Sequence, residues 1–121
     1  MTNSNPFYVC EDYFLLIYET KENAAAGRAM PGWVDPAAVA VATAAVAGRL
    51  VLRGGVPLYG EAAAEYWSKR LNSRVLFSNP NEPIFLIKKE DKYWHVIIGE
   101  RVGWIIAEDW IGIKELKNNA K

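Results

Sequence analysis

The stretch that decides the fold is Tyr93-Trp94-His95-Val96-Ile97-Ile98-Gly99-Glu100-Arg101-Val102-Gly103-Trp104-Ile105. Aromatic and β-branched residues dominate both of its ends, and a glycine and charged residues separate them, which is typical of a β-hairpin. The stretch predicts strands over 93–98 and 103–107. Alternation along the first strand puts one set of side chains on one face and the other set on the opposite face. The two sets are Tyr93, His95 and Ile97, and Trp94, Val96 and Ile98.

Shorter runs of similar composition lie on both sides of this hairpin. They predict strands over residues 7–10, 13–18, 74–78, 84–89 and 111–113, and a further short strand over 50–52. The linkers at 79–83 and 90–92 are short enough to join consecutive antiparallel strands. The second half of the chain is therefore predicted to be an antiparallel meander.

The region between residues 21 and 73 has a different composition, rich in alanine, glycine and valine. Residues 21–31 are predicted to be a loop. Asp35-Pro36 is a typical helix start, so a helix is expected over about 36–48, and because it is apolar all round we expect it to be covered on more than one side. A second helix is expected over about 61–72. These features predict an α+β protein: a β framework with a helical insert over 21–73.

Length and charge limit the classes of function. A chain of 121 residues suits one domain over 1–121, with a flexible polar tail over 117–121. Fourteen basic and fourteen acidic residues balance, which argues against nucleic acid and membrane partners and favours a homodimer. The start of the chain does not resemble a secretory leader, and no apolar run is long enough to span a bilayer, so we expect a cytoplasmic protein.

Residues 93–96, 99–105 and 110–111 resemble the bacterial Src-homology-3-like domain, whose usual pattern is an aromatic strand, a glycine hairpin, Gly-Trp-Ile and a closing aliphatic strand. The resemblance covers about 75–113. It implies a small antiparallel barrel of five or six strands, with the two predicted helices inserted after the first strand. That insert departs from the family, so either the long loop of the family is expanded into a helical insert or the fold is a different small α+β barrel.

The same resemblance implies which side chains face the barrel interior. Val96 matches the buried position of the family, so Trp94 is expected to be partly buried with it, and Trp104 is expected to fill the interior. Tyr93 and His95 would then lie on the outward face, where members of the family commonly contact ligands.

Catalytic and metal sites have little support in the sequence. Cys10 and His95 are the only residues of their types, and a nucleophile–base pair is one interpretation of them. The other interpretation is that Cys10 is a small buried hydrophobe. One cysteine excludes an internal disulfide and a zinc thiolate cluster. Arg53-Gly54-Gly55 lacks the Lys-Ser/Thr ending of a phosphate loop. We therefore predict no catalytic residue, metal or cofactor.

Aromatic residues make up 12% of the chain, with five Trp and six Tyr, which is more than a small core requires. We therefore predict a non-catalytic cytoplasmic module that binds a protein segment through exposed aromatic residues, with Tyr93, His95 and Trp110 in contact with the ligand. Three alternatives remain: a core plus a dimer interface, an immunity protein or antitoxin that acts by occlusion, and a small-molecule-binding protein with a pocket between barrel and insert.

Overall fold

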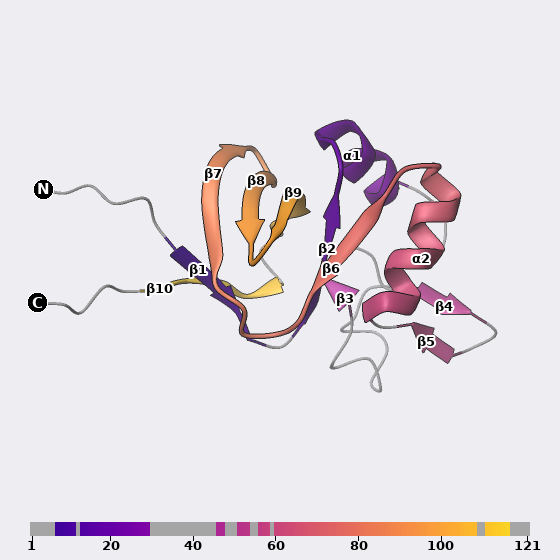
Figure 1. Ribbon diagram of the computed structural model, residues 1–121, viewed down its shortest axis with the longest axis horizontal. Helices are drawn as coiled ribbons and strands as arrows, with labels where there is room; N and C mark the ends of the chain where they lie inside the picture. The colour runs from indigo at the N-terminus through magenta and orange to yellow at the C-terminus, as the bar shows by residue number, and fades with distance from the viewer. Residues whose placement is uncertain are drawn as a thin grey trace, which may run out of the picture.

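A curled eight-stranded sheet with two helices at one end forms the described part of the protein (Figure 1). The computed structural model describes residues 7–11, 13–29, 46–47, 51–53, 56–58, 60–108 and 111–116, and at 46–47, 51–53 and 56–57 it describes the backbone alone. The fold is α+β, as the sequence predicts.

The sheet follows the order β10 (Ile113–Leu116), β1 (Phe7–Cys10), β7 (Ile84–Glu90), β8 (Tyr93–Ile98), β9 (Arg101–Ile106), β2 (Phe14–Tyr18), β3 (Val46–Ala47). A further strand, β6 (Val75–Ser78), also pairs with β2. All of these pairs are antiparallel except β2 with β3, which is parallel. A separate two-stranded hairpin consists of β4 (Val51–Arg53) and β5 (Val56–Leu58).

The predicted hairpin is confirmed, because β8 and β9 pair in register from Tyr93↔Ile106 to Ile98↔Arg101. Gly99, in the turn between them, has a φ of 64°, a left-handed conformation that glycine adopts without strain. The predicted consecutive pairing is correct for β7, β8 and β9. It is wrong for β6, which pairs with β2 instead of β7.

The sheet is larger than the predicted barrel of five or six strands, because the predicted strands over 7–10 and 13–18 both form and join different parts of it. The chain bends at Glu11, and the strands before and after the bend join different parts of the sheet. β1 lies between β10 and β7, whereas β2 lies beside β6 and β9. The result is a curled, half-barrel sheet.

The second predicted helix is confirmed as α2 (Gly60–Leu71). The helix packs on the sheet through Ala63 and Trp67, which are fully buried. Asn72 follows the helix with a φ of 53°, a left-handed residue of the kind that ends many helices.

A helix that the sequence analysis did not predict, α1 (Lys21–Ala29), occupies most of the expected loop over 21–31. Thr20 caps it, since the backbone N–H of Asn23 donates a 3.0 Å hydrogen bond to the Thr20 hydroxyl. Its buried face consists of Ala24 and Gly27, which lack the large apolar side chains that mark a helix in a sequence. A Cβ on Gly27 would lie 2.9 Å from the Tyr18 ring, so the small residue permits close packing.

The first predicted helix, over 36–48, is wrong at its C-terminal end. Val46–Ala47 forms β3, which extends the sheet beside Phe14 and Leu15, and β-branched valine suits this strand. Residues 36–45 and the predicted tail over 117–121 lie outside the described residues. Neither helix of the described part of the chain is long and apolar enough to cross a membrane.

Two clusters of buried residues lie on opposite faces of the sheet. The inner core fills the curl and includes Val96, as predicted, with Trp94 partly buried against it. The helix-side core lies between the sheet and the two helices, and centres on Tyr18 and Trp67. In Figure 1 both helices lie beside β2, β6 and β9, at the end of the molecule away from β1 and β10.

Trp104 lies on the helix side of the sheet, which corrects the prediction that it fills the barrel interior. It stands directly opposite His95 in the β8–β9 register, so both side chains point to the same face. Trp104 is partly buried against the helix-side core. The residue of β9 that faces the interior opposite Trp94 is Ile105, which is fully buried.

Replacing Gly103 with alanine should destabilise the fold. A Cβ at this position would lie 2.5 Å from the backbone oxygen of Tyr18 and 2.7 Å from the Ile17 side chain, so β2 and β9 would have to separate. We expect a loss of about 1–3 kcal/mol in the free energy of unfolding. Denaturant titration measures the loss. Gly112→Ala adds a Cβ with no atom within 4 Å but at a φ of 78°, so it measures the separate cost of a left-handed backbone, which Gly103 does not have. A Gly103→Ala midpoint equal to wild type would contradict the close packing.

Candidate functional site

Five apolar side chains form a continuous row across the face of the sheet that carries Tyr93 and His95, here called the outer face. The strand registers place each member directly opposite the next, so all five share this face. We call Leu116, Phe7, Phe85, Ile97 and Val102, in β10, β1, β7, β8 and β9 respectively, the apolar row.

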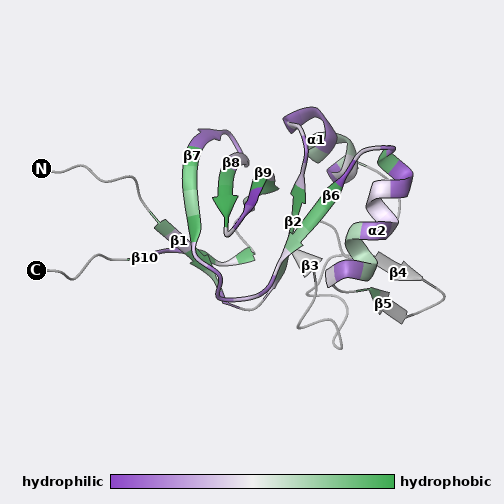
Figure 2. Ribbon diagram, viewed as in Figure 1, coloured by the Kyte–Doolittle hydropathy of each residue, from purple (hydrophilic) through white to green (hydrophobic). Residues whose placement is uncertain are grey.

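The apolar row is open to solvent at both of its ends. Among the described large hydrophobic residues, the four that are exposed are Phe7 at 46%, Ile87 at 45%, Val102 at 55% and Leu116 at 43%. Three of these belong to the row, and the rings of Phe7 and Phe85 pack edge to face with centroids 5.3 Å apart. Figure 2 shows hydrophobic residues in the first half of β7 and at the end of β8. Isolated exposed apolar residues are ordinary, but a contiguous row is a feature of interaction sites.

A bulge in β7 extends this apolar surface. The register with β8 shifts between Leu86 and Lys88, so Ile87 is an extra residue in β7. Because of this extra residue, Lys88 lies opposite His95 on the outer face instead of entering the inner core. Ile87 is exposed at the bulge, two residues after Phe85 of the row in the sequence.

The aromatic residues expected to bind a ligand have different surroundings. His95 stacks on Trp104, with ring centroids 4.7 Å apart and planes 6° apart, and forms a partly exposed pair beside the row. Tyr93 shares the outer face, as predicted, but it packs against the helix-side core, and α1 covers part of this end of the face. Trp110 lies outside the described residues. The structure therefore brings His95 close to the apolar row and places Tyr93 beside α1.

The hypothetical Cys10–His95 pair is not formed. Cys10 is buried in the inner core, where its thiol donates a 3.6 Å hydrogen bond to the backbone oxygen of Ile111, whereas His95 lies on the outer face. The sheet separates the two side chains, so the thiol cannot pass a proton to this imidazole.

Ion pairs hold α1 over one end of the outer face. Lys21 of α1 lies 2.7 Å from the Glu90 carboxylate, and Lys88 lies 2.7 Å from its other oxygen. Hydrogen bonds from these two ammonium groups lower the pKa of Glu90 to about 2. At the other end of α1, the guanidinium of Arg28 pairs with Glu108, which raises the pKa of Arg28. The helix is therefore fixed beside the row and leaves the row itself uncovered.

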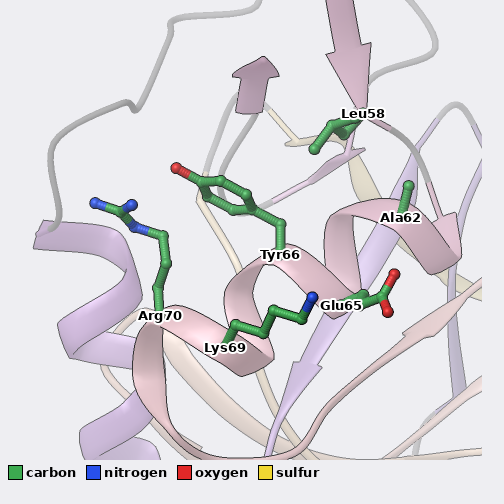
Figure 3. Close-up of a pocket in the computed structure, with 6 residues that line it drawn as sticks. All are labelled: Leu58, Ala62, Glu65, Tyr66, Lys69 and Arg70. Carbon is green, nitrogen blue, oxygen red and sulfur yellow. The ribbon is translucent and has the colours of Figure 1, made fainter.

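A second surface feature is an open groove along α2 (Figure 3). It lies between Leu58 of β5 and the exposed side of the helix, with a volume of about 310 Å³. Tyr66 stands in the groove, and the Arg70 guanidinium lies 5.2 Å from the centre of its ring. The other lining residues are Ala62, Glu65 and Lys69. The groove thus combines an aromatic surface with exposed charges.

Among the described residues, no group of three or more His, Cys, Asp or Glu side chains is arranged to hold a metal ion. Comparisons with known protein families, with curated proteins and with solved structures give no match to this chain.

The sequence analysis did not find the apolar row. Alternation along each strand indicates which residues share a face, but the row depends on the register between strands that are up to about a hundred residues apart, such as Phe7 and Leu116. The excess of aromatic residues was the feature that indicated an exposed surface.

Truncation of Tyr93 and of Val102 should have different effects on stability. Tyr93→Ala removes a ring that packs on the helix-side core, so we expect a loss of roughly 2–3 kcal/mol in the free energy of unfolding. Val102→Ala removes two methyl groups from an exposed position, so the change should stay within about 0.5 kcal/mol. Urea titrations of both variants measure the losses. Equal losses would mean that Val102 is part of a core.

Acid should weaken the contact between α1 and the sheet through Glu90. Its pKa is lower in the folded protein, at about 2, than its ordinary value of 4.5, so its stabilising contribution is complete above pH 4.5 and is lost as the pH falls toward 2. Glu90→Gln should therefore lose less stability than wild type over this range. Urea midpoints measured from neutral pH down to acid test this. Identical curves for wild type and Glu90→Gln would contradict the prediction.

Proposed function

We propose that the protein is a non-catalytic cytoplasmic binding module that docks an apolar segment of a protein on its outer face. The apolar row is the single observation that carries the proposal. Water contact with a contiguous apolar surface is unfavourable, and removing this surface from water on docking supplies free energy at roughly 25 cal/mol per Å².

The surroundings of the row support this proposal. His95 and Trp104 form a flat, partly exposed aromatic pair beside Ile97 and Val102, and aromatic side chains of this kind are frequent anchors at interfaces. Lys88 carries its charge next to this pair but is ion-paired with Glu90, so docking an apolar segment does not require an unpaired charge to be buried.

The proposal keeps the interpretation of the chain as a divergent Src-homology-3-like domain. The β8–β9 hairpin, which carries Gly103-Trp104-Ile105, supports this interpretation. The binding surface that we propose differs from the one implied by the resemblance, because it is centred on the apolar row and His95 instead of on Tyr93.

The groove along α2 favours a second candidate, a small-molecule-binding protein. It has the volume of a ligand site, but it is open along its length, and exposed charges of Glu65, Lys69 and Arg70 form much of its lining. We rank it below the protein-binding proposal, because ligand sites commonly enclose most of the ligand surface. An immunity protein or antitoxin that acts by occlusion would use the same outer face that we propose.

Selection from a random peptide library tests the proposal without a known partner. The protein is immobilised at a density low enough to keep copies apart, and peptides that bind it are selected and measured in solution. We expect peptides with several apolar side chains, whose affinity falls at least about tenfold on Val102→Asp, which places a charge at the end of the row.

The matched control for this selection is Ala62→Asp, which adds the same charge at an exposed position of α2. Affinities that are unchanged by Ala62→Asp and reduced by Val102→Asp support docking on the outer face. A selection that yields no binders, or binders equally sensitive to both variants, would remove the proposal.

A further inference from the structure

The residues next to the apolar row in the sequence cannot cover it with apolar side chains. Phe7 follows Thr2-Asn3-Ser4-Asn5-Pro6, and Leu116 precedes Lys117-Asn118-Asn119-Ala120-Lys121. These two segments are almost entirely polar, so they contribute little apolar surface to bury against the row. These two stretches therefore offer the row less apolar surface than a second copy of the row does.

We propose that the occupant is a second copy of this chain, with the outer faces of the two copies packed together. This inference rests on the proposed function, since it names the partner of the same face. A second copy always brings an apolar row of the same length. Two β-sheets that pack face to face align within about 30° and lie about 10 Å apart, an arrangement in which two rows can interdigitate.

The charges of the molecule permit this association. Fourteen basic and fourteen acidic residues leave no net charge, so two copies do not repel each other over long distances. The charged groups at the edges of the row are already paired within one copy: Lys88 with Glu90, and Lys114 with Glu11. Both lysines are more than half exposed and can stay in water at the rim of the interface.

The size of the row sets the expected strength of the dimer. Five strands about 4.8 Å apart give the row a length of about 19 Å. A stable interface usually buries about 800 Å² on each partner, and a row one residue wide and about 19 Å long is smaller than that. We therefore expect a weak dimer with a dissociation constant in the micromolar range, centred on Phe85, the middle residue of the row.

Analytical ultracentrifugation tests this inference on the full chain, from about 1 to about 500 μM, a range that spans micromolar dissociation constants. Wild type should shift with concentration from 13.6 kDa toward twice that mass. Val102→Asp and Phe7→Asp each place one charge per copy in the apolar interface, and should weaken the dimer at least about a hundredfold. Both positions are exposed, so both variants should fold, which circular dichroism verifies.

Ala62→Asp on α2 serves as the control and should dimerise as wild type does. A wild type that stays at 13.6 kDa throughout would overturn the second copy as occupant, and peptides selected on the row would then still support the proposed function. A dimer that both row variants leave unchanged would overturn this inference, because its interface would lie elsewhere. If the row variants lose peptide binding but still dimerise, the result supports the proposed function and overturns the second copy as the occupant of the row.

Discussion

The close contact between β9 and β2 at Gly103 determines how the rest of the sheet is arranged. The described register between these two strands is a single pair, Tyr18 with Trp104, and it joins the five strands from β10 to β9 to the part of the sheet that carries β6 and the helices. A side chain on Gly103 would collide with the backbone of Tyr18. Tyr18 is paired with Trp104 and shares its face, so its ring lies on the helix side, where Gly27 of α1 packs close to it.

Side-chain hydrogen bonds stabilise the curled sheet at β6, where backbone pairing between strands ends. Arg101 donates a 2.6 Å hydrogen bond to the backbone oxygen of Phe77 in β6, and its guanidinium also lies 3.0 Å from the Glu82 carboxylate, which lowers the pKa of Glu82. Ser68 of α2 accepts a 2.8 Å hydrogen bond from the backbone N–H of Val75 in the same strand. These contacts satisfy polar groups of β6 that have no neighbouring strand, so this edge is less able to pair with another chain.

The parts of the fold that could be predicted are those specified by residues close together in the sequence. The β8–β9 hairpin and α2 each contain their own turn or stripe, and both form nearly as expected. The parts that could not be predicted depend on distant segments: β6 pairs with β2, and α1 is stabilised by small residues against Tyr18 and by ion pairs to Glu90 and Glu108. The face on which Trp104 lies could not be predicted either, because it depends on the register with His95 and not on composition.

The position of the apolar row follows from the way the two helices cover the outer face. α1 and α2 bury the part of this face near Tyr18 and Ile106, and ion pairs fix α1 there, so neither helix extends across β7 or β1. The inner face of the same five strands is filled by the inner core. Phe85 and its neighbours in the row are consequently the large apolar surface that the described fold leaves without cover. A buried position for these side chains would require a third layer, which neither α1 nor α2 provides, so this row is the surface on which the docking proposal rests.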